Sequence, residues 1–147
     1  MLTENLAKLF ERDIQRLKTE IDAYHDEKKL WIALPGTSNP GGNLCLHLLG
    51  NLQHYIGGVL GRSGYVRDRP KEFSNKDIPV AELTTMIDHT VSVVTKTIRS
   101  LDKETLAADY PEKVFEYDMT AEYFLLHLLA HLNYHLGQIN YHRRMIG

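Results

Sequence analysis

The sequence predicts an all-α fold, a four-helix bundle whose helices are joined by long connections. Apolar residues recur at steps of three and four along several stretches, which is typical of amphipathic helices. Clusters of glycine, proline and polar residues separate these stretches, as expected for turns and loops. The chain has 147 residues, of which 43% are hydrophobic and 24% charged. These values suit one globular domain over residues 1–147, in which four helices bury a shared core.

The first two helices are predicted on either side of a strong break. The first runs from Thr3, a suitable N-cap, to about Asp26. Its apolar positions keep the helical spacing: Leu6, Leu9, Phe10, Ile14, Leu17, Ile21 and Tyr24. Residues 35–43 contain two prolines and three glycines and form the break. The second helix runs from Leu44 to about Leu60 and is apolar nearly all round, so we expect it to be buried.

Two long connections flank the third helix. Residues 62–76 are polar and long for a structureless loop, and such loops are often functional. The third helix is predicted from Pro79, after a cap at Asp77 or Ile78, to about residue 101. Residues 102–119 form the second connection, with a short extended piece predicted over residues 114–117. Thr120 is predicted to cap the last helix, which runs to Met145.

Composition and charge exclude several classes of protein. The net charge is −2 and no basic run occurs, which argues against a nucleic-acid partner. No stretch approaches the ~18 consecutive apolar residues of a membrane-spanning helix, so no membrane partner is expected. The single Cys45 cannot form an internal disulfide, and we expect a buried apolar thiol in a reducing compartment. The charged N-terminus does not resemble a signal peptide, so the expected location is the cytoplasm.

A stripe of histidines marks the last helix. His127, His131 and His135 recur every four residues, which places them on one face of a helix. Imidazole is the commonest side-chain ligand for transition metals. His131 and His135, one turn apart, can bind one ion together, and a third ligand must come from another helix. His47 is the natural candidate, because it lies on the polar stripe of the buried second helix. Three protein ligands leave a coordination position open, as in reactive metal sites.

A metal site competes with simpler interpretations of the same residues. A single histidine on an apolar helix is usually a core residue that is hydrogen-bonded to backbone or water. The set is harder to explain this way, since burying several imidazoles without partners costs a few kcal/mol. Two other metal sites are excluded by spacing. The stretch from His131 to His135 lacks the glutamate of the His-Glu-x-x-His zinc proteases, and the Glu-x-x-His pair of di-iron bundles does not occur.

The remaining histidines are expected to support the site or to lie away from it. His127 is predicted to be a supporting group, one turn from the nearer ligand. His54 lies roughly 10 Å along the helix axis from His47, too far to share an ion, and is predicted to be a pocket or core residue. His142 lies near the end of the last helix, where a partly charged imidazole suits the helix dipole. The expected surface histidines are His25 and His89.

The motif His127-Leu-Leu-Ala-His131-Leu-Asn-Tyr-His135-Leu-Gly137-Gln138-Ile139 resembles that of the DinB-like superfamily, metal-binding four-helix bundles that include bacillithiol transferases. His47-Leu48, early in the second helix, resembles the place of the family's first ligand. The resemblance therefore implies a three-histidine site at His47, His131 and His135. A narrower branch also matches around Gly42–Leu52 and Arg67–Phe73. Leu136 departs from many members, which have arginine there. The resemblance implies fold and metal, but it specifies the reaction poorly.

The leading functional hypothesis is a metal-dependent enzyme that acts on a small molecule, such as a thiol S-transferase. One divalent transition metal ion (Zn, Ni, Fe or Mn) would lower the pKa of a low-molecular-weight thiol, whose thiolate attacks an electrophile. Metal-assisted hydrolysis is the alternative within enzymes. It ranks lower because no carboxylate base is evident beside the histidines. A non-catalytic metal-binding or dimeric protein is the alternative from another class.

Further residues are assigned to the pocket and to the substrate. Asn51, His54, Tyr134 and Gln138 are predicted to line the pocket. Three charged residues of the long connection are candidates for contacts with a charged substrate, or else for surface ion pairs: Arg67, Arg69 and Glu72. The glycine-rich, apolar helix faces and the family resemblance also favour a homodimer.

Overall fold

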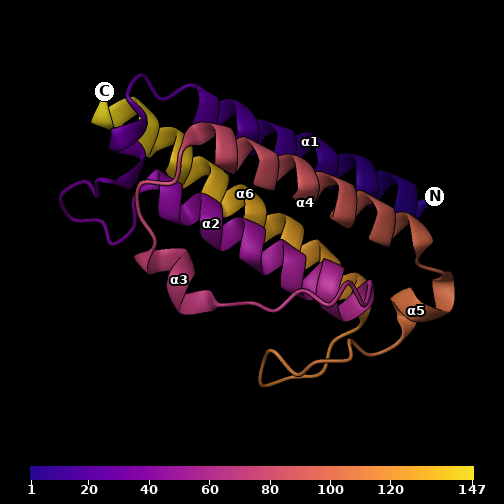
Figure 1. Cartoon of the computed structure of the whole chain (residues 1–147). Helices are drawn as coiled ribbons and strands as arrows, with labels where there is room; N and C mark the ends of the chain where they lie inside the picture. The colour runs from indigo at the N-terminus through magenta and orange to yellow at the C-terminus, as the bar shows by residue number, and fades with distance from the viewer.

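Four long helical elements lie side by side in the computed structural model, which describes residues 1–147 (Figure 1). They are α1 (Leu2–Asp22), α2 (Gly41–Leu52) with its continuation η2 (Gln53–Leu60), α4 (Val80–Ser100) and α6 (Ala121–Ile146). Three short helices lie in the connections: η1 (Glu27–Trp31), α3 (Arg69–Ser74) and α5 (Lys103–Ala107). The predicted all-α bundle with long connections is therefore confirmed. No helix has the combination of length and apolar sequence that crossing a bilayer requires.

The four long elements form two pairs of opposite direction. Figure 1 shows α1 and α6 running one way, and α2 and α4 the other. Side-chain contacts agree with this arrangement. Glu4 near the start of α1 pairs with Arg99 near the end of α4, whereas Asp13 in the middle of α1 binds Asn133 in the middle of α6. Because α2 and α4 are parallel, the chain needs the long connection over residues 61–79 to return to the start of the bundle.

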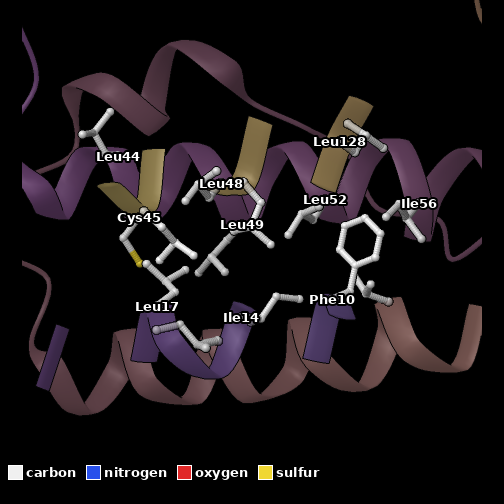
Figure 2. Close-up of a cluster of buried hydrophobic side chains, with 14 of the residues drawn as sticks. Phe10, Ile14, Leu17, Leu44, Cys45, Leu48, Leu49, Leu52, Ile56 and Leu128 are labelled. Carbon is white, nitrogen blue, oxygen red and sulfur yellow. The ribbon is translucent and has the colours of Figure 1, made fainter. Parts of the chain in front are cut away.

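The core forms where α1, α2, α4 and α6 face one another. Figure 2 shows side chains of α1 and α2 that point toward a shared layer, with Leu128 of α6 beside them. Phe10, Ile14 and Leu48 are fully buried in this layer. Cys45 is buried as predicted, and burial raises the pKa of its thiol to about 12. Cys45 is therefore a core residue and not a nucleophile at neutral pH.

Three of the four long helices begin at residues other than the predicted ones. Thr120 caps α6 as predicted, because its hydroxyl accepts a hydrogen bond from the backbone N–H of Tyr123. Helix α1 instead begins at Leu2 with Met1 in the cap position, so the cap at Thr3 was wrong. Pro79 is itself the cap residue of α4, one or two positions after the predicted caps.

Helix α2 begins at Gly41, three residues before the predicted start. The sequence does not indicate this first turn, because two successive glycines have a low intrinsic propensity for a helix. Gly41 is needed here for close packing, since a Cβ atom on it would overlap the hydroxyl oxygen of Tyr24. That hydroxyl donates to Nδ1 of the buried His142, whose Nε2 donates to the carbonyl of Ile32. His142, which we predicted to suit the helix dipole near the end of the last helix, is thus a buried residue with hydrogen bonds at both ring nitrogens.

The second half of the predicted second helix has a wider turn. From Gln53 to Leu60 the backbone is π-helical, and the N–H of Gly61 donates to the carbonyl of Ile56, five residues earlier. Such turns hold more residues than an α-helical turn, so side chains after Asn51 leave the stripe predicted from a period of 3.6. This change of period displaces His54 from the face that carries His47.

Both long connections contain helices that the sequence analysis did not predict. Asp68 caps α3 by accepting a hydrogen bond from the backbone N–H of Lys71. Asn43 of α2 donates to the carbonyl of Glu72, which fastens α3 against α2. Asp102 caps α5 in the same manner as Asp68. The extended piece predicted over residues 114–117 is wrong, because the one β-bridge of the chain joins residues 109 and 120.

Candidate metal centre

Three histidines from two facing helices meet at one point. His47 comes from α2, and His131 and His135 come from α6, one turn apart. The Nε2 atom of His131 lies 3.3 Å from Nε2 of His47 and 3.1 Å from Nε2 of His135. Ligand nitrogens at about 2.0–2.1 Å from a tetrahedral ion lie about 3.3 Å apart. The observed spacing therefore fits a group that could hold one metal ion.

The neighbours of two rings determine which nitrogens face this point. Nδ1 of His47 lies 3.0 Å from a carboxylate oxygen of Glu72. Nδ1 of His135 lies 2.6 Å from the amide oxygen of Gln138. Both oxygens are acceptors, so each Nδ1 carries the proton and each Nε2 presents a lone pair. If His131 carries a proton on Nε2, that proton can be donated to the Nε2 atom of only one of the other two histidines at a time. A cation, in contrast, can accept the lone pairs of all three Nε2 atoms.

Burial keeps His131 and His135 neutral, which is the form of imidazole that can bind a metal. Burial, and then the positive charge of neighbouring imidazoles, lowers the pKa of His131 to about 4. Burial also lowers the pKa of His135, against an opposing effect of its hydrogen bond to Gln138. Both imidazoles are therefore neutral at pH 7, and neutral imidazole is the metal ligand.

Glu72 reaches the site from α3 and supports His47. Its carboxylate is only 6% exposed, and it accepts two hydrogen bonds from Arg67, at 2.8 and 3.0 Å. Burial opposes its ionisation, but the hydrogen bonds from His47 and Arg67 prevail and hold the pKa of Glu72 below its ordinary value. Gly50 of α2 makes room for this carboxylate, because a Cβ atom there would overlap its Oε2 atom. The ionised carboxylate of Glu72 thus orients the His47 ring through a hydrogen bond to its Nδ1 atom.

The sequence model of the DinB superfamily matches residues 9–139, which include all three histidines. The chain belongs to the DinB superfamily. No curated protein matches the sequence. Superfamily membership and the three-histidine group are both compatible with metal binding. The resemblance inferred from the histidine motif is thus confirmed.

A cavity of about 260 Å³ opens beside the histidines of this DinB-superfamily chain. The predicted pocket residue Asn51 lines it together with His47 and His131. Asn51 is 7% exposed, and its Oδ1 atom has no hydrogen-bond partner. His127 also lines the cavity, where its ring stacks between those of Phe124 and His131 without reaching the three Nε2 atoms.

The other predicted site residues have different positions in this superfamily member. Gln138 contacts His135 directly. Tyr134 is 65% exposed and packs edge-to-face against His135, and it lines a second cavity of about 530 Å³ together with His135 and Gln138. His54 lies outside the cavity and pairs with Glu112 at 3.1 Å. Arg67 and Arg69 do line the cavity, whereas Glu72 lies behind His47.

Sequence reasoning missed the aromatic side of the site. Phe73 of α3 packs against His47, with ring centroids 5.0 Å apart. Tyr55, Phe115 and Phe124 also line the cavity. Phe115 belongs to the connection over residues 102–119, which lacks periodicity, so no pattern in the sequence pointed to it.

Proposed function

We propose that this DinB-superfamily protein binds one divalent transition metal ion through His47, His131 and His135, and acts on a small molecule. The reaction that we propose is transfer of a low-molecular-weight thiol to an electrophile. The observation that carries the proposal is the convergence of three imidazole nitrogens, in which Nε2 of His131 lies 3.3 Å from Nε2 of His47 and 3.1 Å from Nε2 of His135. Three protein ligands leave a position open, which is the pattern of reactive rather than structural sites.

The surrounding residues support binding and orientation in this proposal. Glu72 and Gln138 hold the protons of two ligand rings away from the ion. A bound ion would supply one effect, a lower pKa for a thiol beside it, which makes the thiolate available at neutral pH. The cavity beside the histidines offers space for the body of a substrate.

The hydrogen bonds and the lowered pKa of Glu72, the one carboxylate near the site, favour thiol transfer over hydrolysis. A hydrolase of this kind would use a free carboxylate to take a proton from water. Glu72 is hydrogen-bonded to His47 and to Arg67, and its pKa is low, so it is a poor proton acceptor. No carboxylate side chain lines the cavity itself. The residues present therefore favour a reaction whose nucleophile is a substrate thiolate.

The test is a turnover assay with cysteine as the thiol and 1-chloro-2,4-dinitrobenzene as the electrophile. A sulfur–carbon bond forms, chloride leaves and the thiol proton passes to solvent. We expect zinc-, nickel-, iron- or manganese-loaded protein to exceed both the metal-free protein and the loaded His131→Ala variant by at least tenfold. Equal rates for loaded and metal-free protein, with this and other small thiols and electrophiles, would remove the transferase proposal.

A further inference from the structure

We propose that the cavity beside the three histidines recognises a small organic carboxylate with an aromatic or other apolar body. The proposal names the substrate class for the function proposed above and in that respect rests on it. Three features of the cavity carry it: an excess of positive charge, a polar side chain without a partner, and an aromatic wall.

The positive charge comes from Arg67, in the connection that precedes α3, and from Arg69, the first residue of α3. Arg69 makes no hydrogen bond and no ion pair, and its guanidinium carbon lies 5.3 Å from the centre of the Phe73 ring. Arg67 uses Nε and Nη2 to bind Glu72, which leaves its Nη1 group without an acceptor. Glu72 is the nearest carboxylate, and His47 also binds it. The cavity thus holds guanidinium N–H groups that no acidic side chain satisfies, and a carboxylate matches their geometry.

The polar side chain without a partner is Asn51. It is 7% exposed, yet its Oδ1 atom accepts no hydrogen bond within the chain. Buried polar atoms are nearly always paired, so an exception at a cavity points to a partner from outside the chain. A ligand that carries an N–H or O–H donor near its carboxylate would supply that partner.

The aromatic wall indicates the rest of the ligand. Phe115 and Phe124 meet edge-to-face, with centroids 5.9 Å apart, and Tyr55 packs against Phe124 at 5.0 Å. These rings line the cavity together with the histidines and the arginines. An inorganic anion would contact the arginines but leave this wall unfilled. A carboxylate on an apolar body satisfies both sides of the cavity.

The probe is benzoate, which tests the arginines and the aromatic wall, compared with its neutral analogue benzamide and with inorganic phosphate. Benzamide also carries an N–H donor for Asn51 and benzoate does not, so tighter binding of benzoate reports its charge. Binding is measured by titration calorimetry on the full-length protein, both metal-free and zinc-loaded. The metal-free form matters because a carboxylate could otherwise bind the ion alone. We expect benzoate to bind both forms at least tenfold more tightly than benzamide, and more tightly than phosphate. Arg69→Gln should weaken benzoate at least fivefold and leave benzamide unchanged.

The matched control is Arg144→Gln, since Arg144 also sits 5.3 Å from a ring centre, that of Tyr141, but does not line the cavity. This control should bind benzoate as the wild type does. The proposal is overturned if benzoate binds no better than benzamide or phosphate, or if Arg69→Gln retains wild-type affinity. Zinc content is measured in the same samples. Loss of benzoate selectivity with full zinc content overturns only the carboxylate site, whereas absence of zinc from the wild type contradicts the proposed function.

Discussion

At the scale of single residues, the site depends on which ring nitrogen of each histidine carries the proton. The sequence was sufficient to place His131 and His135 on one helix face, since a separation of four residues fixes their relative direction. It also identified His47 as a polar residue on an apolar helix. Glu72 could not be predicted as the partner of His47, because 25 residues separate them and no periodicity relates a loop to a helix.

The neutral state of His131 predicts that the metal-free protein loses stability in acid. The pKa of His131 is about 4 in the folded protein, against an ordinary value of 6.5. As pH falls through this window, the unfolded chain binds a proton that the folded chain does not, so the free energy of unfolding decreases. The ring is only partly buried, so solvent screening limits the loss to about 1–2 kcal/mol.

Urea unfolding of the metal-free wild type and of His131→Gln, each at pH 7 and pH 4.5, measures this effect. The variant should lose less stability between the two pH values, because glutamine does not titrate. The same loss in both proteins would show that His131 is protonated as readily in the folded state as in the unfolded state.

At the scale of elements, the long amphipathic helices could be predicted and the irregular ones could not. Helices α1, α4 and α6 repeat the 3/4 spacing over five or more turns, which is a strong signal. The six residues of α3 are too few to show a period. The π-helical η2 contradicts the period of 3.6 that the prediction assumed. These irregular elements nevertheless shape the site, since α3 supplies Glu72 and η2 moves His54 away.

Gly50 predicts a measurable link between α3 and metal affinity. Gly50→Ala would displace the carboxylate of Glu72, because the added Cβ overlaps its Oε2 atom. Loss of a carboxylate behind a ligand histidine typically weakens metal binding by about 10–100-fold. We expect a loss of about tenfold in zinc affinity, measured by competition with a chromogenic chelator.

Gly137→Ala is the matched control, since it makes the same substitution on the other ligand-bearing helix. A Cβ atom at Gly137 meets nothing within 4 Å. Alanine favours the helix over glycine by roughly 1 kcal/mol at both positions, so helix propensity does not distinguish the two variants. Equal zinc affinities in the two variants would show that the position of Glu72 has no bearing on the site.

At the scale of the whole molecule, α6 has more than one functional face. One face packs in the core, and the next carries the histidines. A third face exposes large apolar side chains at helical spacing: Tyr123, Leu126, Tyr134, Tyr141 and Met145. Exposed apolar residues that line up along one helix are typical of an interaction surface. We propose that this face forms the homodimer expected from the sequence, with a second copy of α6 as the partner.

Light scattering during size-exclusion chromatography tests the dimer. We expect the wild type to elute with the mass of two chains at micromolar concentration. Leu126→Glu should yield monomers, because it buries a charge in the proposed interface. Val66→Glu, a substitution of another exposed apolar residue away from α6, should remain dimeric. A monomeric wild type would exclude this role for α6.

The central claim is that three histidines from two helices bind one metal ion. Elemental analysis of protein purified without a histidine tag, and then incubated with Zn, Ni, Fe or Mn and desalted, tests it most directly. We expect about one ion per chain in the wild type and in His25→Ala, which removes an exposed histidine outside the three-histidine group. The variants His47→Ala, His131→Ala and His135→Ala should each retain less than a fifth of that content. Wild-type content in all three variants, or no bound ion in the wild type, would contradict the account.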